Sequence, residues 1–395
     1  MDTGRGTGTD GRAGAVARGR GRAGEAGGVP TLEDVARAAG VSRATVSRVV
    51  NGVRNVDPAI QQAVQRAVAA TGYVPNRAAR SLVTRRSGAV ALVVCGTGSA
   101  ATGGRDEFAA RVFQDPFFGR VVGGVVRGLR PRGVHPVLMF ADTGEDRAEV
   151  LSYLTRGGAD GALLVTTRAR DPLPGMLAAA GVPAVLFARP PADVPLDHVD
   201  LRHREGGALA ARHLLARGCA RLAVIGGPAD IPASRERVAG FCDAVAAAGG
   251  RVRAGTGDFT LDGGEHAMRL LLAEQPDLDG VFAANDLMAQ GACLVLREHG
   301  RRIPDDVAVI GFDDSSAAAA SRPRLTTVRQ PVEDMAAEMV RLLLDRVTGI
   351  TGVTGITGVT GAAAGADPGP AKGAPTGTEP AAVLFAPELV VRDSA

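Results

Sequence analysis

The sequence predicts a small all-α head followed by an α/β body built from two parallel-sheet lobes. Residues 30–84 contain short amphipathic stretches with capping residues at their starts, which is typical of a compact helical unit. Residues 88–348 alternate short apolar runs with amphipathic helical stretches, which indicates parallel sheet buried on both faces. The apolar runs are too many for one compact domain, so we expect two lobes.

The head follows a Gly/Arg-rich stretch, residues 1–28, which has no periodicity and is predicted to be disordered. Thr31 is suited to cap a first helix, with Asp34 near the positive end of the helix dipole. Gly40 then supplies a turn, and Ser42 caps a second helix. The apolar residues of this second helix recur at helical spacing and are Val46, Val49 and Val50. Two capped helices joined by a glycine turn predict a helix-turn-helix.

The outer face of the second helix is basic and polar. Arg43 and Arg48 carry guanidinium forks, which match the paired acceptors of a guanine edge or a phosphate. Ala44 offers only a methyl group, whereas Thr45 and Ser47 have short hydroxyls for phosphate or base-edge bonds. Two arginines alone would favour an ordinary solvated helix face. The capped frame favours instead a helix that enters the major groove of DNA.

Two more short segments complete the head. Asp57, followed by proline, predicts the start of a third helix that ends near Gly72 and serves as scaffold. Asn76 is suited to cap a short helix over residues 77–83, which is too short to be stable alone and is expected to order on DNA. Leu82 would then be an exposed apolar wedge for the minor groove. The alternative for Leu82 is packing on the body.

The charge distribution favours a polyanion as the partner of the head. The chain has 395 residues, with 45 Lys and Arg against 42 Asp and Glu, and a formal net charge of +3. Residues 29–87 contain nine Arg and three acidic residues, a net charge of +6, and residues 1–28 carry +2, which leaves −5 for the remainder. On charge alone, a solvated basic face remains the alternative.

Polar side chains directly follow two predicted strands of the body. Asn285 and Asp286 follow one apolar run, and Asp313 ends another. Ligands of open α/β sheets bind outside the carboxyl ends of the strands, and carboxylates and amides there suit sugar-like hydroxyl pairs. The alternative is that these residues only cap the helices that follow.

The end of the chain contains a compositional break. Residues 348–381 form a low-complexity tract of Thr, Gly, Ala and Pro, which we interpret as an exposed insertion. The apolar pattern resumes over residues 382–394 and predicts a strand or strand pair that re-enters the core.

Several classes of protein are disfavoured. No apolar run reaches the roughly 18–20 residues of a membrane span, and the N-terminus lacks the apolar core of a secretory signal, so we expect a cytoplasmic protein. The four cysteines form no C-x-x-C pair, which predicts free thiols and no metal site. The run "CGTGSAA" at 95–101 is a weak match to a dinucleotide turn, so neither an enzyme nor a cofactor is expected. A free sugar-binding protein would need export and would leave the basic head unexplained.

Longer motifs resemble a known family. The runs "TLEDVARAAGVSRATVSRVVN", "GYVPNRAARSL", "FAANDLMAQG" and "RIPDDVAVIGFDD" resemble the lactose-repressor (LacI/GalR) family of bacterial transcription regulators, over roughly residues 30–347 and 382–394. The resemblance implies an N-terminal helix-turn-helix head plus an α/β periplasmic-binding-protein-like body of two doubly wound parallel-sheet lobes. It also implies a homodimer, pseudo-palindromic operator DNA, and a small-molecule effector, sugar or sugar-like, between the lobes.

The resemblance assigns domains and site residues by position. It divides the chain into a DNA-binding domain (30–75), a hinge helix and linker (76–87), and an effector-binding and dimerisation domain (88–347 with 382–394). The DNA-binding residues would be Thr31, Arg43, Ala44, Thr45, Ser47, Arg48 and Asn51, with Asn76, Arg77, Ala79 and Leu82 in the hinge. The effector-binding residues would be Asp115 and Phe117 in a first-lobe loop, the cleft arginine Arg237, and Asn285, Asp286 and Asp313.

The chain also departs from the family pattern. Arg202 and His203 stand where the family usually has an Asp-Asn pair, which removes an anion from the expected cleft. Residues 96–114 carry an insertion that is expected to lie at the cleft mouth. No leucine heptad follows the last strand, which favours a dimer over a tetramer. The chain is expected to cross between the lobes near 189–196, near 318 and near 381.

Overall fold

The computed structural model describes residues 30–50, 56–74, 86–96, 105–165, 168–190, 194–348 and 379–395. The chain divides into two compact units, Met1–Val83 and Thr84–Ala395. No helix among the described residues is long and apolar enough to cross a membrane.

The described part of the first unit consists of three helices, α1 (Leu32–Ala39), α2 (Arg43–Val50) and α3 (Pro58–Thr71). The predicted caps are confirmed. The Thr31 side chain accepts from the Asp34 amide, and the Asp34 carboxylate accepts in return from the Thr31 amide at 2.9 Å. The Ser42 hydroxyl accepts from the amide of Thr45 at 3.2 Å, and Asp57 caps α3. The small core of this unit is formed by Val35, Val46, Val64 and Ala67.

The first lobe of the body is built on a six-stranded sheet in the order β11-β5-β4-β3-β1-β2, in which all neighbours are parallel. Its strands are β1 (Ala89–Cys95), β2 (His135–Ala141), β3 (Ala162–Val165), β4 (Ala184–Phe187), β5 (Asp197–Leu201) and β11 (Ala382–Phe385). Its helices are α5 (Arg105–Gln114), α6 (Pro116–Leu129), α7 (Gly144–Thr155), α8 (Leu173–Ala179) and α14 (Val332–Thr348), with the 3-10 turn η1 (Arg130–Arg132).

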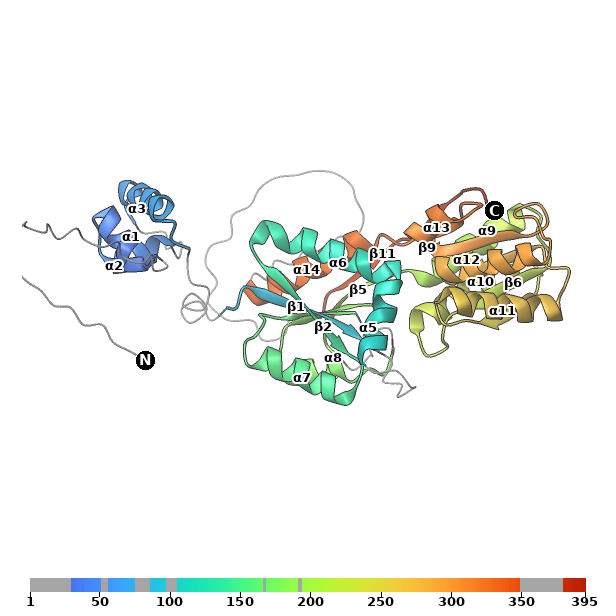
Figure 1. Cartoon of the computed structure of the whole chain (residues 1–395). Helices are drawn as coiled ribbons and strands as arrows, with labels where there is room; N and C mark the ends of the chain where they lie inside the picture. Colours follow the sequence, from blue (N-terminus) through green and yellow to red (C-terminus); the bar gives the residue numbers. More distant parts are fainter. Residues whose placement is uncertain are drawn as a thin grey trace, which may run out of the picture. The chain divides into compact units, whose positions relative to one another are not determined.

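Both faces of this sheet are covered. Alternate residues of β1 pack in opposite directions, with Val90 and Leu92 in one core cluster and Ala91 and Val93 in another. The first cluster includes side chains of α6 and α14, and the second includes side chains of α7 and α8. Figure 1 shows these two pairs of helices on opposite sides of the sheet. This two-sided burial explains the continuous apolar runs of the sequence.

The second lobe repeats this plan in the order β12-β10-β9-β8-β6-β7, with only β12 antiparallel to its neighbour among the described strands. The helices α9 and α10 pack on one face of this sheet, and α11 and α12 pack on the other. The strands are β6 (Leu222–Gly226), β7 (Val252–Thr256), β8 (Gly280–Ala283), β9 (Ala308–Asp313), β10 (Thr326–Arg329) and β12 (Glu388–Val390). The helices are α9 (His203–Ala216), α10 (Pro232–Ala247), α11 (Leu261–Glu274), α12 (Asp286–Glu298) and α13 (Ser316–Ala320).

The chain crosses between the lobes at three places, and all three expected positions were wrong. The first crossover follows β5, because residues 197–201 still pair with β4. The second lies between β10 and α14, because residues 326–329 still pair with β9. The third lies between β11 and β12. The positions expected near 189–196, 318 and 381 each precede a strand that still pairs within the lobe the chain was expected to leave, and that pairing decides the lobe to which the strand belongs.

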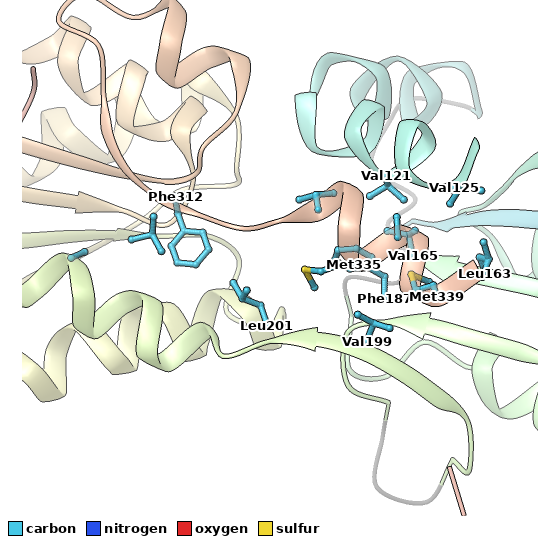
Figure 2. Close-up of a cluster of buried hydrophobic side chains, with 14 of the residues drawn as sticks. Val121, Val125, Leu163, Val165, Phe187, Val199, Leu201, Phe312, Met335 and Met339 are labelled. Atoms are coloured by element: carbon cyan, nitrogen blue, oxygen red, sulfur yellow. The ribbon is translucent and has the colours of Figure 1, made fainter. Parts of the chain in front are cut away.

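One apolar cluster continues through the region where the crossovers lie. Figure 2 shows Phe312 of β9, Leu201 at the end of β5 and Met335 of α14 within this cluster, together with Phe187 and Val199 of the first lobe. Full burial of one such side chain contributes about 1.5–3 kcal/mol. The crossovers therefore lie beside buried apolar side chains of both lobes.

Candidate DNA-binding helix and interlobe ligand cleft

The candidate DNA-reading face lies on α2. Arg43, Ala44 and Arg48 are exposed, while Val46 on the opposite side is fully buried. The Arg43 guanidinium lies 3.0 Å from a carboxylate oxygen of Glu33 on α1, and its side chain is 67% exposed. An exposed pair of this kind contributes only about 0–1 kcal/mol, so Arg43 can exchange Glu33 for a phosphate or a base at little cost.

The remaining DNA-binding candidates divide into two groups. The hydroxyl of Thr45 lies 2.9 Å from that of Ser42, so it takes part in the cap of α2, and Thr31 takes part in the cap of α1. These two side chains position the helices whatever else they contact. Ser47 is half-buried on α2, and the other candidates, which lie outside the described residues, are Asn51, Asn76, Arg77, Ala79 and Leu82.

The candidate ligand site in the body is built around Arg237 of α10, whose side chain is 7% exposed. Its Nη1 donates to the main-chain oxygen of Ala284 at 2.6 Å, its Nη2 donates to Oε1 of Gln330 at 2.9 Å, and its Nε donates to Nδ1 of His203 at 3.2 Å. The guanidinium carbon lies 3.7 Å above the centre of the Phe312 ring. A buried cation is tolerated here because each nitrogen has a partner.

Close helix packing places this arginine. A Cβ atom at Gly207 of α9 would overlap the main-chain oxygen of Arg237, and one at Gly240 of α10 would overlap that of Arg204. The two helices can therefore approach this closely only because both positions are glycine.

Asp313 provides the negative charge beside Arg237. Its Oδ1 lies 3.2 Å from Nη1 of Arg237, but it is buried and accepts no hydrogen bond from the described residues. The residue ends β9 with a φ of 101°, in the left-handed region that few side chains adopt. The strained backbone aims a carboxylate with free acceptor capacity at the arginine, which is an arrangement suited to a hydroxyl ligand.

Asn285 and Asp286 are both engaged by the fold. Asn285 caps α12, since its Oδ1 accepts from the Met288 amide at 2.9 Å, and its Nδ2 donates to the main-chain oxygen of Phe259 at 2.8 Å. The Asp286 carboxylate accepts from the hydroxyl of Thr327 at 2.6 Å and from the amide of Ser315 at 2.7 Å. Burial, reinforced by the nearby charge of Asp313, raises the pKa of Asp286 to about 7. Asn285 therefore does what the alternative interpretation expected, because its side chain caps the helix that follows.

The first lobe contributes Asp115 and Phe117. Asp115 caps α6, with Oδ1 accepting from the amide of Phe117 at 2.9 Å. Burial raises the pKa of Asp115 to about 6, and the charges of Asp313 and Arg237 also act on it. The ring of Phe117 packs edge-on against Phe187, with centroids 5.3 Å apart. The predicted residues of both lobes therefore converge on the same charged centre.

An open cavity of about 580 Å³ meets this centre at His203, but none of the six predicted effector residues is among its lining residues. The cavity lies between the lobes. Arg168, Asp171 and Arg189 line it from the first lobe, and residues of the first crossover and of α10 complete its lining. Arg168 pairs across the lobes with Asp230 at 3.0 Å. The volume of this cavity lies in the range of small-molecule sites. No group of three His, Cys, Asp or Glu able to hold a metal ion occurs among the described residues.

Two family models match the chain. The model described as "Bacterial regulatory proteins, lacI family" matches residues 31–76, and that described as "Periplasmic binding protein-like domain" matches residues 211–356. The "HTH-type transcriptional regulator CelR" of Thermobifida fusca is 47% identical over 326 residues, which cover 81% of this chain and 92% of the relative. The "Ribose operon repressor" of Escherichia coli (strain K12) is 34% identical, over 80% of this chain and 93% of the relative.

The chain belongs to the lacI family of bacterial regulatory proteins. Solved structures agree with this assignment. A structure described as "transcriptional regulator CelR-cellobiose complex" has a TM-score of 0.66 and 40% identity, and covers 93% of this chain and 100% of its own. A lac repressor dimer bound to operator has a TM-score of 0.70 at 24% identity, covers 92% of this chain and 98% of its own, and supports the fold. The prediction of a DNA-binding transcription regulator, and not an enzyme, is confirmed.

Sequence reasoning on this lacI-family chain missed the partners of the cleft arginine. His203 is buried, and burial lowers its pKa, so its neutral ring accepts from Arg237 through Nδ1 while Nε2 lies 3.4 Å from Asp200. Gln330, at the second crossover, was not singled out at all. The departure at Arg202-His203 was the available signal for His203, but the sequence did not place it against Arg237.

The insertion before α6 packs on its own lobe. Phe108 and Phe113 of α5 lie edge-on to Phe140 of β2, with centroids 5.8 Å and 6.0 Å apart. The described residues of α5 line neither the cavity of about 580 Å³ nor another of about 670 Å³ beside α6.

Proposed function

We propose that this lacI-family regulator binds a pseudo-palindromic operator as a homodimer, and that a carbohydrate in the interlobe cleft changes its operator affinity. The observation that carries the proposal is the occurrence in one chain of an exposed basic helix α2 and a buried guanidinium, Arg237, beside a carboxylate with free acceptor capacity. The first suits a major groove, and the second suits a pair of hydroxyls. Since its DNA partner lies there, we place the protein in the cytoplasm.

The proposed DNA contacts follow the geometry of α2. Arg43, Arg48 and Ala44 are exposed and face outward, so they are assigned to base edges and phosphates, with Thr45, Ser47 and Asn51 beside them. Thr31 would hold the start of α1 against the backbone of DNA. Hinge residues Asn76, Arg77, Ala79 and Leu82 would order on the operator, with Leu82 inserted in the minor groove.

The proposed ligand contacts lie around Arg237. Asp313 and Arg237 would bind adjacent hydroxyls of one sugar, and Asp115 and Phe117 would close on it from the first lobe. Asn285 and Asp286 support the site and would contact the sugar only by exchanging their present partners. Cellobiose is the first sugar to test, because a relative with 40% identity has been solved as a cellobiose complex.

Selection of genomic DNA fragments on the purified full chain tests this function. Fluorescence anisotropy then measures the Kd of the selected fragment with and without cellobiose, ribose and other sugars. We expect a fragment with two-fold related half-sites, and at least one sugar that changes its Kd by about 5–150-fold. Affinity for the selected fragment that no sugar changes would contradict the ligand-gated part of the proposal.

A further inference from the structure

A guanidinium of the first lobe reaches the second lobe beside the cleft. Arg120 lies on α6, and its side chain is 19% exposed. Its Nη1 donates to the main-chain oxygen of Asp313 at 2.6 Å, and its Nη2 donates to the main-chain oxygen of Gln330 at 3.0 Å. Asp313 ends β9 of the second lobe, and Gln330 lies at the second crossover. One first-lobe side chain therefore holds the backbone at the boundary of the lobes at two points.

The same two residues hold the cleft arginine through their side chains. The Asp313 carboxylate lies 3.2 Å from Arg237, and the Gln330 amide oxygen accepts from Arg237 at 2.9 Å. Asp313 and Gln330 thus connect two arginines, with side chains toward Arg237 and carbonyl groups toward Arg120. Both residues are buried, and the Asp313 backbone is in the left-handed region, so neither has room to rotate its side chain independently of its main chain.

The surroundings of Arg120 leave space for the lobes to move. A cavity of about 670 Å³ adjoins its side chain, bounded by α6 on one side and by residues 314–316 with Arg392 on the other. A Cβ atom at Gly119 or Gly123 of α6 would meet nothing within 4 Å. Because apolar packing does not fill this part of the boundary, the hydrogen bonds of Arg120 fix the distance between the lobes there.

Arg120 is firmly anchored on its own lobe. Its Nε and Nη2 each donate to an oxygen of Glu333 at 2.8 Å. These hydrogen bonds lower the pKa of Glu333 and keep the carboxylate charged. Since Glu333 lies in the first turn of α14, a displacement of Arg120 is passed to both α6 and α14.

We propose that Arg120 is the positioning residue through which a ligand bound at Arg237 changes the orientation of the first lobe. A sugar hydroxyl that bonds to Arg237 or Asp313 competes with the ion pair between Arg237 and Asp313 and with the hydrogen bond from Arg237 to Gln330. The two side chains shift, their carbonyl groups follow, and Arg120 carries the change to α6 and α14. The inference rests on the proposed function for its ligand and its operator.

Two variants and one matched control isolate this role. Arg120→Met removes all the donors and keeps an unbranched side chain, while Arg120→Lys keeps the charge beside Glu333 but cannot bridge two carbonyl groups. The control is Arg127→Met, because Arg127 also joins α6 to α14, through Asp334 at 2.6 Å. Its side chain is 57% exposed, and none of its hydrogen bonds among the described residues reaches the second lobe.

The first test measures the distance between the lobes without any ligand. Spin labels are attached to Ala180→Cys in the first lobe and Ala273→Cys in the second, both exposed, in the full chain. Cys219 and Cys242 are replaced by alanine, since Cys95 and Cys293 are buried. Double electron–electron resonance should give a broader and shifted distance distribution for Arg120→Met and Arg120→Lys, and an unchanged one for Arg127→Met. Distributions for both Arg120 variants identical to the parent would overturn the proposal.

The second test measures coupling with cellobiose as the probe. The ratio of operator Kd values with and without cellobiose should fall below about two-fold in Arg120→Met and stay at the parent value, within about 5–150-fold, in Arg127→Met. The cellobiose Kd should change little in either variant. If the ratio of operator Kd values with and without cellobiose in Arg120→Met equals that of the parent, the proposed role of Arg120 is contradicted. A parent chain without response to cellobiose would count against the proposed sugar, and the distance measurement then decides the role of Arg120 by itself.

Discussion

Arg237 is the residue on which the proposed ligand site depends. Its charge is buried, and it is held by one carboxylate, two neutral oxygens, one ring nitrogen and one aromatic face. Removing such a cation leaves the carboxylate of Asp313 buried without its partner, a change that costs about 3–5 kcal/mol.

We therefore expect Arg237→Met to lower the free energy of unfolding by about 3–5 kcal/mol and to abolish sugar binding. Urea unfolding and calorimetric titration of the full chain measure the two effects. Arg212→Met, which changes an exposed arginine on the neighbouring helix α9, is the control and should leave both unchanged. Parental stability in Arg237→Met would show that the buried network is absent in solution.

Asp286 predicts a pH dependence of stability. Its pKa in the folded chain, about 7, lies well above its value in the unfolded chain, about 3.9, so the folded state binds more protons between these values. The stabilisation is present below pH 4 and is lost as the pH rises to about 7. Compared with Asp286→Asn, the parent should lose unfolding free energy more steeply over this range, as measured by urea unfolding at a series of pH values. Parallel pH profiles would contradict the raised pKa.

Arg43 predicts a loss of base discrimination. If its fork contacts a guanine edge, Arg43→Ala should reduce the preference for the operator over a single-base variant by about 1–3 kcal/mol. Arg37→Ala is the control, because Arg37 is exposed on α1 and pairs with Asp34. Competition binding measures, for each variant, the preference for the operator over the single-base variant. Equal losses on operator and random DNA would restrict Arg43 to a phosphate contact.

At the residue scale, the sequence predicted what depends on neighbours along the chain. The caps at Thr31, Ser42 and Asp57 were found because a cap and the amide that it binds lie within three residues. The roles of His203 and Gln330 were not found, since they arise where two crossovers meet α10 in space. Local spacing contains no signal for such a convergence.

At the element scale, close helix packing decides how the first lobe is built. A Cβ atom at Gly124 of α6 would lie 2.5 Å from the main-chain oxygen of Glu333 and 2.7 Å from Cβ of Ala336 on α14. The helices were predicted from periodicity, and the strands from continuous apolar runs. The lobe crossovers were misplaced, because strand pairing is not a local property.

This packing predicts opposite effects at adjacent glycines. Gly124→Ala should lower the free energy of unfolding by about 1–3 kcal/mol, because α14 must move away. Gly123→Ala meets nothing within 4 Å and should raise it by up to about 1 kcal/mol through helix propensity. Chemical unfolding of both variants tests this. Equal effects would mean that α6 and α14 do not pack through Gly124.

At the scale of the whole molecule, the chain contains a basic head, with three helices among its described residues, and a two-lobed body with a charged centre between its sheets. Binding to DNA should depend steeply on salt, since the arginines of the head release counterions from phosphates. The fold class was predictable because each lobe repeats the same alternation of apolar strand and helix. The identity of the ligand was not, since it depends on side chains that meet only in the folded body.

The preference of the purified full chain for its selected operator over a scrambled duplex of equal composition tests the central claim most directly. Competition anisotropy at physiological salt should give a preference of about a thousand-fold or more, with two-fold symmetric protection in a hydroxyl-radical footprint. Equal affinity for the two duplexes would contradict the account.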